Sequence, residues 1–201
     1  MIIDTAAQGT SEWKQAKLGT PSASAFDMII TASGEPSKQR KKYMYALAAE
    51  RITGSKEEGY KNAAMERGIE MEAEARNMYE LMTGNTVIQV GICYPDKKKL
   101  FGCSPDGLIS DDGLIEIKCP TSPVHVGYLL DGILPADYFQ QTQGQLLVTG
   151  RKWVDFFSFY PGLKSLIIRV KPDEKFLKAL TIELFVFVKQ LDEVVEKLKG
   201  L

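Results

Sequence analysis

Residues 104–120 read SPDGLISDDGLIEIKCP, and this stretch decides how the rest of the chain is interpreted. Two apolar runs flank the sequence DDG at 111–113, which strongly favours a turn. The stretch is therefore predicted to form a β-hairpin. Asp106 and Glu116 lie almost symmetrically about the turn, so either plausible register places them opposite each other or within two residues.

Alternation along the second strand of this hairpin separates polar from apolar side chains, because successive side chains point to opposite faces of a sheet. Glu116 and Lys118 share one face with Leu114. The opposite face, which can pack into the core, carries Ile115, Ile117 and Cys119. With Asp106 on the neighbouring strand, the hairpin is expected to gather two carboxylates and one ammonium group at one point of a sheet.

This cluster suits metal-dependent hydrolysis. Carboxylate oxygens are the ligands that hard cations such as Mg²⁺ and Mn²⁺ prefer. Such a cation would stabilise charge on a phosphodiester and activate a water, while Lys118 could position that water or help to deprotonate it. The alternative is an exposed hairpin in which Glu116 and Lys118 form an ordinary ion pair. Glu-x-Lys alone is common by chance, but the preceding Pro-Asp and the intervening turn favour the site.

A helix predicted over residues 63–82 adds a third carboxylate. Projection at roughly 100° per residue gives a polar side with Glu66, Glu70, Glu74, Asn77 and Glu80. The apolar side carries Met65, Gly68, Ile69, Met71, Ala75, Tyr79 and Met82. Glu72 falls in the middle of the apolar side, where a carboxylate is costly to bury without a partner. It is expected to face a cation, either a metal ion or Arg76 one turn later, and the sequence leaves both open.

Composition narrows the chemistry further. The chain has 201 residues, 44% of them hydrophobic and 25% charged, which suits one domain with a substantial core. No membrane span and no signal peptide are expected, and the three cysteines lack the spacing of a zinc site, so a reducing cytoplasm is the expected location. The single histidine, His125, is most simply structural, which disfavours Ser-His-Asp hydrolases and histidine-rich metal sites.

Charge alone does not indicate a nucleic-acid protein, since the formal net charge is −1 and the isoelectric point is near 6.0. Basic residues are nevertheless clustered at 38–42 and at 97–99. A solvated loop or helix end explains such clusters without any DNA. Metal-site carboxylates also enter this sum as negative charges, and bound divalent cations would reverse their effect locally.

Patterns along the whole chain predict a mixed α/β fold. Helices are expected over residues 11–17, from residue 24, and over 43–52, 63–82, 135–147 and 176–198. Strands are expected over 86–94, 101–109, 114–119, 153–160 and 165–170. Ser11 and Ser24 are candidate helix caps, the latter because Asp27 follows it as in a capping box.

Four ordered stretches together carry a family resemblance. They are, in chain order, the segment 18–24, RGIEMEAEAR at 67–76, CSPDGL at 103–108 followed by GLIEIKCP at 113–120, and YFQQTQ at 138–143 continuing to 149. In this order and spacing the sequence resembles lambda-type phage exonucleases, which are YqaJ-like viral recombinases of the PD-(D/E)xK nuclease superfamily. The similar stretches cover most of the chain, and their order is more specific than any one motif.

The resemblance implies a fold and a metal site. The fold is restriction-endonuclease-like, a central mixed sheet flanked by helices, in a single nuclease domain over residues 1–201. Asp106 and Glu116 would bind metal together with the carbonyl of Ile117. Lys118 would be the catalytic lysine.

Two further side chains follow from the same resemblance. Glu72 would support a second metal ion, so that two Mg²⁺ ions are expected in each active site, with Mn²⁺ as a possible substitute. Gln141 matches a catalytic glutamine on the helix beside the site. Gln145 shares its helical face, which a polar surface would equally explain.

The family also holds the 5′-terminal phosphate of DNA in a small pocket. Lys17, Ser24 and Ser104 stand at the matching positions. Lys17 replaces an arginine, which keeps the charge but loses the bidentate fork. Ser24 is equally explained as a helix cap, although a helix N-terminus is also a natural phosphate site. Candidates for contact with the DNA backbone are Lys38, Arg40, Lys41, Lys42 and Gln143.

The function implied is a 5′→3′ exonuclease that degrades one strand of linear double-stranded DNA to mononucleotides and leaves 3′ single strands for recombination by annealing. A homotrimeric ring around DNA and a phage single-strand annealing protein as partner are implied too, in the cytoplasm of a bacterial host. The alternatives are a structure-specific endonuclease of the same superfamily, a non-catalytic DNA-end-binding accessory protein, and a hydrolase of small phosphate esters.

Overall fold

A five-stranded mixed sheet runs through the computed structural model, which describes residues 1–57 and 63–201 and omits the side chains of residues 63–66 and 69. The strand order is β2-β4-β5-β6-β7, with β5 and β6 parallel and the other neighbours antiparallel. These strands are β2 (Val87–Ile88), β4 (Gly107–Ile109), β5 (Gly113–Lys118), β6 (Trp153–Ser158) and β7 (Leu166–Val170), and a separate pair joins β1 (Ile2–Ile3) to β3 (Cys93–Tyr94).

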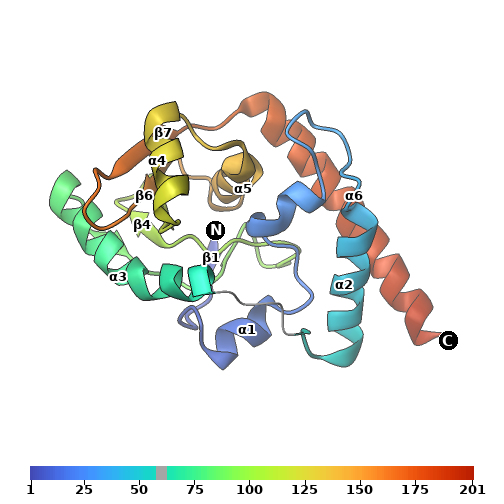
Figure 1. Ribbon diagram of the computed structural model, residues 1–201. Helices are drawn as coiled ribbons and strands as arrows, with labels where there is room; N and C mark the ends of the chain where they lie inside the picture. The colour runs from blue at the N-terminus through green and yellow to red at the C-terminus, as the bar shows by residue number, and fades with distance from the viewer. Residues whose placement is uncertain (58–62) are drawn as a thin grey trace.

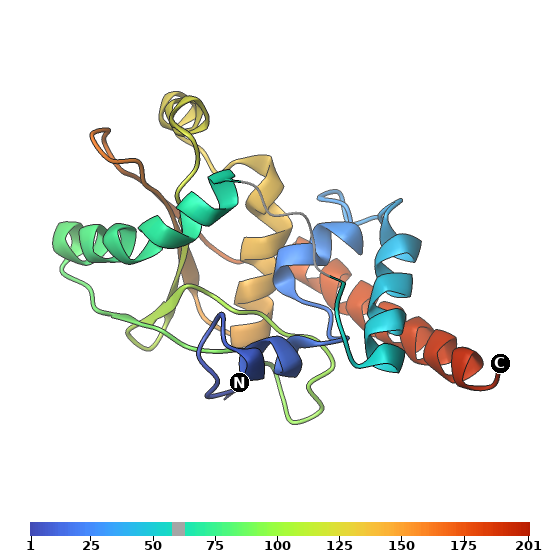
Figure 2. The ribbon, with the colours of Figure 1, turned by 60° about the horizontal axis from the view of Figure 1, so that its bottom comes forward.

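Helices cover both faces of this sheet. α3 and α5 lie on its opposite sides, and α2 and α6 pack together beyond α5 (Figure 1, Figure 2). The α-helices are α1 (Ser11–Lys17), α2 (Arg40–Thr53), α3 (Ala63–Thr83), α4 (Ser122–Asp131), α5 (Phe139–Thr149) and α6 (Glu174–Lys199). Two 3₁₀ helices are η1 (Ala23–Met28) and η2 (Ala136–Tyr138). Of the predicted faces of α3, the side chains of Met65, Glu66 and Ile69 lie outside the described residues.

The face of the sheet toward α3 combines an apolar core with a buried polar network. Ile115 of β5 packs there in one cluster with Ala75 of α3. Beside them, the hydroxyl of Tyr79 donates to Oδ2 of Asp155 at 2.7 Å. Arg169 binds both oxygens of the same carboxylate, at 2.8 and 2.9 Å. A bidentate guanidinium and a hydroxyl together satisfy a carboxylate that is 1% exposed.

The opposite face packs against α5. Leu108 of β4 and Leu114 of β5 share an apolar cluster with Leu146 of α5. On its far side α5 approaches η1 so closely that a Cβ at Gly144 would lie 2.5 Å from the ring of Phe26. Glycine is required at this position, because any side chain would push the two elements apart. α5 is thereby held firmly between η1 and the sheet.

The outer layer is formed by α6, whose side chains repeat with helical periodicity. Asp173 caps its start by accepting from the N–H of Phe176 at 2.9 Å. The side of α6 that packs on α2 and η1 buries Phe176, Leu180, Leu184, Phe187, Val188, Leu191 and Val195. Within residues 1–57 and 63–201, no helix has the length and apolar character needed to cross a membrane.

The predicted fold class is confirmed, but two predicted strands are wrong in extent. Residues 86–94 form only the two short strands β2 and β3, which belong to different sheets. The chain between them turns along the N-terminal segment, where a Cβ at Gly91 would lie 2.4 Å from the carbonyl oxygen of Ala6. Residues 101–109 form a strand only in β4, because their first half makes isolated bridges to other segments.

Local helix predictions also need correction. Thr10, and not Ser11, caps α1 by accepting from the N–H of Trp13 at 3.2 Å. Ser24 lies exposed inside η1, whose N-cap is Ser22, so it is not a cap. The helix α4 was not predicted. It carries His125, which is buried and has Nδ1 2.7 Å from the Ser158 hydroxyl, in keeping with a structural role.

Replacing Tyr79 with phenylalanine is expected to lower the free energy of unfolding by about 1.5–3 kcal/mol, because it removes a hydrogen bond to a buried charged acceptor. Tyr79 and Asp155 are both buried, so water cannot replace the lost hydroxyl. Urea unfolding measures the change. Tyr45→Phe, at a tyrosine that is 52% exposed on α2, is the control and should change stability by less than about 0.5 kcal/mol. Equal stability of the two variants would contradict the role given to the network.

Candidate active site

Asp106 lies directly before β4 and opposite Glu116. Gly107 pairs with Ile115 in the β4–β5 ladder, and continuing this register by one residue brings Asp106 opposite Glu116. Beyond the last pair of the ladder, the N–H of Ile117 donates to Oδ2 of Asp106 at 2.6 Å. The Asp106 carboxylate therefore completes the hydrogen bonding of β5 where β4 ends, and this bond fixes its position.

Glu116 is the most buried carboxylate of the cluster, with 2% of its surface exposed. Lys118 and Gln141 both donate to its Oε1, the latter from Nε2 at 2.5 Å. Gln145 donates from Nε2 to Oε2 at 2.5 Å. A carboxylate could not remain buried without such donors. The predicted pair of Glu116 and Lys118 therefore exists, but in a buried cluster under α5 and not on an exposed hairpin.

Lys118 is held as a cation by its surroundings. Burial alone would lower the pKa of its ammonium group, but the charges of Glu116 and Asp106 outweigh burial and raise that pKa above its ordinary value. The Nζ atom also lies 5.2 Å from the ring centroid of Tyr138, a cation–π contact. Tyr138 packs in turn on Phe156 of β6, with 5.0 Å between ring centroids. In this arrangement Lys118 is suited to orient a water or stabilise negative charge.

The surroundings of Asp106 disfavour its charged form. Burial raises its pKa well above the ordinary value, and the charge of Glu116 raises it further, while Lys118 acts in the opposite direction. Two carboxylates in this relation favour either a shared proton or a bound cation. Because their oxygens are ligands for hard cations, Asp106 and Glu116 fit a divalent metal ion.

Glu72 lies on α3 with 35% of its side chain exposed. Its Oε1 accepts from Arg76 at 2.7 Å, so the local ion pair that the sequence left open is formed. Its charge still contributes to the raised pKa of Asp106. Across the described part of the chain, no three Asp, Glu, His or Cys side chains converge as a ready metal-ligand group. The structure thus brings Asp106 and Glu116 together and leaves Glu72 paired with Arg76.

Two of the three residues expected to bind the 5′-phosphate, Lys17 and Ser104, contact the side chain of Trp13. The indole Nε1 donates to the Ser104 hydroxyl at 3.2 Å, and Lys17 Nζ lies 4.7 Å from the centroid of the indole ring. Burial lowers the pKa of Lys17, and the charge of Lys56 lowers it further. Ser24, the third candidate, is exposed in η1. A partly buried cation and a serine hydroxyl that contact the same indole are each suited to an anionic group.

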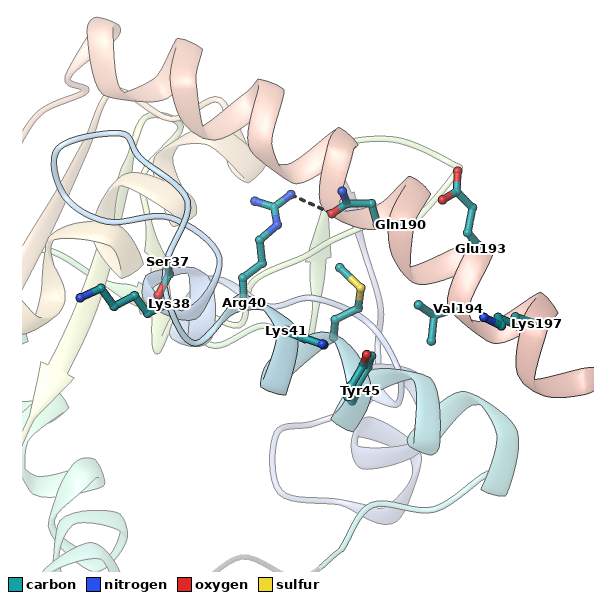
Figure 3. A pocket seen from close by; sticks show the side chains of 10 residues that line it. Ser37, Lys38, Arg40, Lys41, Tyr45, Gln190, Glu193, Val194 and Lys197 are labelled. Carbon is teal, nitrogen blue, oxygen red and sulfur yellow. Dashed lines mark hydrogen bonds between the residues drawn. The ribbon is translucent and has the colours of Figure 1, made fainter. Parts of the chain in front are cut away.

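The basic residues around the start of α2 divide into two kinds. Lys38 and Lys41 line a groove of about 560 Å³ between α2 and α6, in which Lys197 also takes part (Figure 3). Arg40 lies in the same groove, but its guanidinium is committed to α6, with NH1 2.5 Å from the Glu183 carboxylate. The exposed lysines are therefore free to meet another molecule, whereas Arg40 mainly joins two helices. Lys42 is exposed on the first turn of α2.

Gln143 is placed differently from the expectation that it contacts the DNA backbone. It is 1% exposed. Its Nε2 donates to the carbonyl of Lys171 at 2.9 Å, and its Oε1 accepts from the N–H of Asp173 at 2.8 Å. Both ends of the amide are thus used to bind the segment that leads into α6, which leaves no polar atom for DNA.

The sequence model of the YqaJ-like viral recombinase domain matches residues 12–152, more than half of the chain. The chain belongs to this family. A search of curated proteins gives no significant match to this YqaJ-like domain.

Solved structures show that this YqaJ-like domain is homologous to exonucleases. The chain is similar to the alkaline exonuclease LHK-Exo from Laribacter hongkongensis, at 36% identity and a TM-score of 0.86, over 95% of this chain and 97% of that chain. A structure of LHK-Exo in complex with dAMP matches equally well. A phage-related exonuclease from Haemophilus somnus 129PT shares the fold, with a TM-score of 0.67 at 14% identity, over 89% of this chain and 96% of that chain.

Three side chains of the YqaJ-like site were not assigned from sequence. Tyr138 and Trp13 contact Lys118 and Lys17 through their rings, and no spacing in the sequence signals such contacts. Gln145 was visible only as a glutamine one turn after Gln141. Its role follows once it is known that this face of α5 packs over β5 and does not face solvent.

Asp106→Asn is expected to be more stable than the wild type at about pH 8 in EDTA, because it removes the repulsion by Glu116 and keeps an acceptor for Ile117. The folded-state pKa of Asp106 lies above its unfolded value. Raising the pH from about 4 through the folded pKa therefore costs the wild type stability, by at most about 1.4 kcal/mol per pH unit. The advantage of the variant should grow over this range in urea unfolding. Asp111→Asn in the exposed turn is the control, and a wild-type advantage at high pH would contradict the argument.

Proposed function

We propose that this chain is a divalent-metal-dependent exonuclease that degrades one strand of linear double-stranded DNA to mononucleotides in the 5′→3′ direction. The observation that carries the proposal is the buried cluster of Asp106, Glu116 and Lys118, in a chain 36% identical to an alkaline exonuclease over 95% of its length. The dAMP of the LHK-Exo complex is a mononucleotide of the kind that this reaction releases.

The proposed roles follow from the geometry of the cluster. Asp106 and Glu116 would hold the metal ion, with the carbonyl of Ile117 as a further oxygen ligand. A bound divalent ion polarises the scissile phosphate and lowers the pKa of a water. Lys118, a cation beside these carboxylates, would orient that water or stabilise charge on the phosphate. Gln141 would help to keep the Glu116 carboxylate in place.

A second ion is part of the proposal through Glu72. Its carboxylate is partly exposed, and its charge contributes to the raised pKa of Asp106. Supporting a second ion requires Glu72 to release Arg76, which lies one helical turn away. Two ions would stabilise both the attacking and the leaving oxygen of an in-line displacement.

The proposed polarity is supported by the side chains that contact Trp13. Lys17 and Ser104 contribute an ammonium group and a hydroxyl, both of which suit a terminal phosphate. Ser24 completes the set that the family resemblance implies. An enzyme that anchors the 5′-phosphate beside the metal site would degrade the strand that carries it.

The homotrimeric ring and the single-strand annealing protein are further parts of the proposal. Three neighbouring apolar side chains on α6 support self-association, since Ile182, Phe185 and Val186 are 62%, 50% and 42% exposed. Light scattering of the purified protein distinguishes a monomer from a trimer.

The first test is digestion of linear duplex DNA labelled at one 5′ end, with Mg²⁺ or with EDTA. Mg²⁺-dependent release of labelled mononucleotide from the linear duplex, faster with a 5′-phosphate than with a 5′-hydroxyl, is expected. Lys118→Ala should lose at least about 100-fold in rate, because general acid–base and electrostatic groups contribute about that much. Lys152→Ala, at an exposed lysine directly before β6, is the matched control.

Three outcomes would contradict the proposal. Cutting of a covalently closed circle would indicate an endonuclease. DNA-end binding without cleavage would indicate an accessory protein. Cleavage of a chromogenic phosphodiester without cleavage of DNA would indicate a hydrolase of small esters.

The groove between α2 and α6 gives a prediction about DNA binding. Replacing both Lys38 and Lys41 with glutamine should reduce the slope of log affinity against log salt by up to about 1.8, since each phosphate contact contributes about 0.9. Duplex binding is measured in EDTA, where no strand is degraded. The control replaces Lys175 and Lys178, which are exposed at the start of α6, with glutamine. An unchanged slope for the first variant would remove this groove from the DNA path.

A further inference from the structure

Gln145 contacts the candidate metal site from α5, through the one oxygen of Glu116 to which no other described side chain donates a hydrogen bond. Gln141 and Lys118 share Oε1, whereas among the described residues only Gln145 donates to Oε2. Gln145 is 1% exposed. Water therefore has no access by which it could replace this donor.

The two ends of the Gln145 amide differ in their hydrogen bonding. Its Nε2 binds Glu116, but its Oε1 is buried and has no hydrogen-bond partner among the described residues. Gln143, two positions before Gln145 on the same helix, uses both ends of its amide to bind backbone groups. A glutamine kept for packing alone would be expected to resemble Gln143, since a buried unpaired acceptor destabilises the folded state.

The position of Gln145 does not depend on a flexible loop. It lies one turn after Gln141 on α5, and α5 is fixed between the sheet and η1 by the close approach at Gly144. The donor atom is therefore held by the backbone of a helix at a constant height above β5. Groups that bind a metal ligand from behind in this way orient the ligand and tune its affinity for the ion.

We propose that Gln145 is a positioning residue for Glu116, an inference that rests on the proposed metal-dependent function. By holding Oε2, it restrains the rotation of the carboxylate, so that Oε1 would be the oxygen available to a metal ion. Gln145 itself touches neither the metal nor the substrate. Its loss would therefore weaken metal binding and catalysis while leaving the DNA-binding surface intact.

The test compares Gln145→Met with the wild type. Methionine has a similar length and shape but cannot donate a hydrogen bond. Calorimetric titration of the protein with Mn²⁺ in the absence of DNA should show about 10- to 100-fold weaker binding, and kcat on linear duplex should fall by a similar factor. KM for DNA should stay within about twofold. Gln140→Met is the matched control, because Gln140 is a buried glutamine of α5 that donates to the carbonyl of Ile30 at 3.4 Å.

The outcomes separate this inference from the proposed function. An inactive wild type with no Mn²⁺ binding would overturn the proposed function. An active wild type with Gln145→Met unchanged in Mn²⁺ affinity and kcat would overturn the inference alone, as would a loss no larger than that of Gln140→Met at equal thermal stability. If Gln145→Met does not fold, Gln145→Leu removes the donor with a shorter apolar side chain. It should then show the same loss of kcat at unchanged KM, and full activity would overturn the inference.

Discussion

The structure depends most on the burial of one carboxylate, that of Glu116. With 2% of its surface exposed, it requires hydrogen-bond donors, and three side chains from two elements supply them. β5 provides Lys118 two residues further along the same face, and α5 provides Gln141 and Gln145 one turn apart. Asp106 then lies opposite as a second carboxylate. The arrangement of α5 over β5 and the end of β4 at Gly107 both follow from this requirement.

A comparison with the other buried carboxylate of the sheet separates stability from function. Asp155 faces α3 and is fully satisfied by the guanidinium of Arg169 and the hydroxyl of Tyr79. On the α5 side, the Asp106 carboxylate is left next to Glu116, and burial together with the charge of Glu116 raises its pKa. A sheet selected only for stability would not retain this second arrangement. A divalent cation bound between the two carboxylates would relieve their repulsion and so give this arrangement a function.

Periodicity and turn chemistry predicted much of this arrangement because they are local. The hairpin, the facing of Asp106 and Glu116, and the helices α3 and α6 all follow from spacing along the chain. Interactions between distant segments could not be predicted in this way. The chain at 86–94 splits between two sheets because it also packs on the N-terminal segment, and Arg40 is engaged by Glu183, 143 positions away. Likewise, Gln143 and Gln145 look alike in sequence and differ only in what α5 is packed against.

The most direct test of the central claim is a crystal structure with Mn²⁺ and dAMP, with the ion located by its anomalous scattering. The account predicts a peak at about 2.1 Å from carboxylate oxygens of both Asp106 and Glu116. It also predicts that Gln145 still donates to the other oxygen of Glu116, while Lys118 has moved off the oxygen that binds the ion. A Mn²⁺ ion bound elsewhere, with the contact between Lys118 and Glu116 still closed, would contradict the claim that this cluster is a metal site.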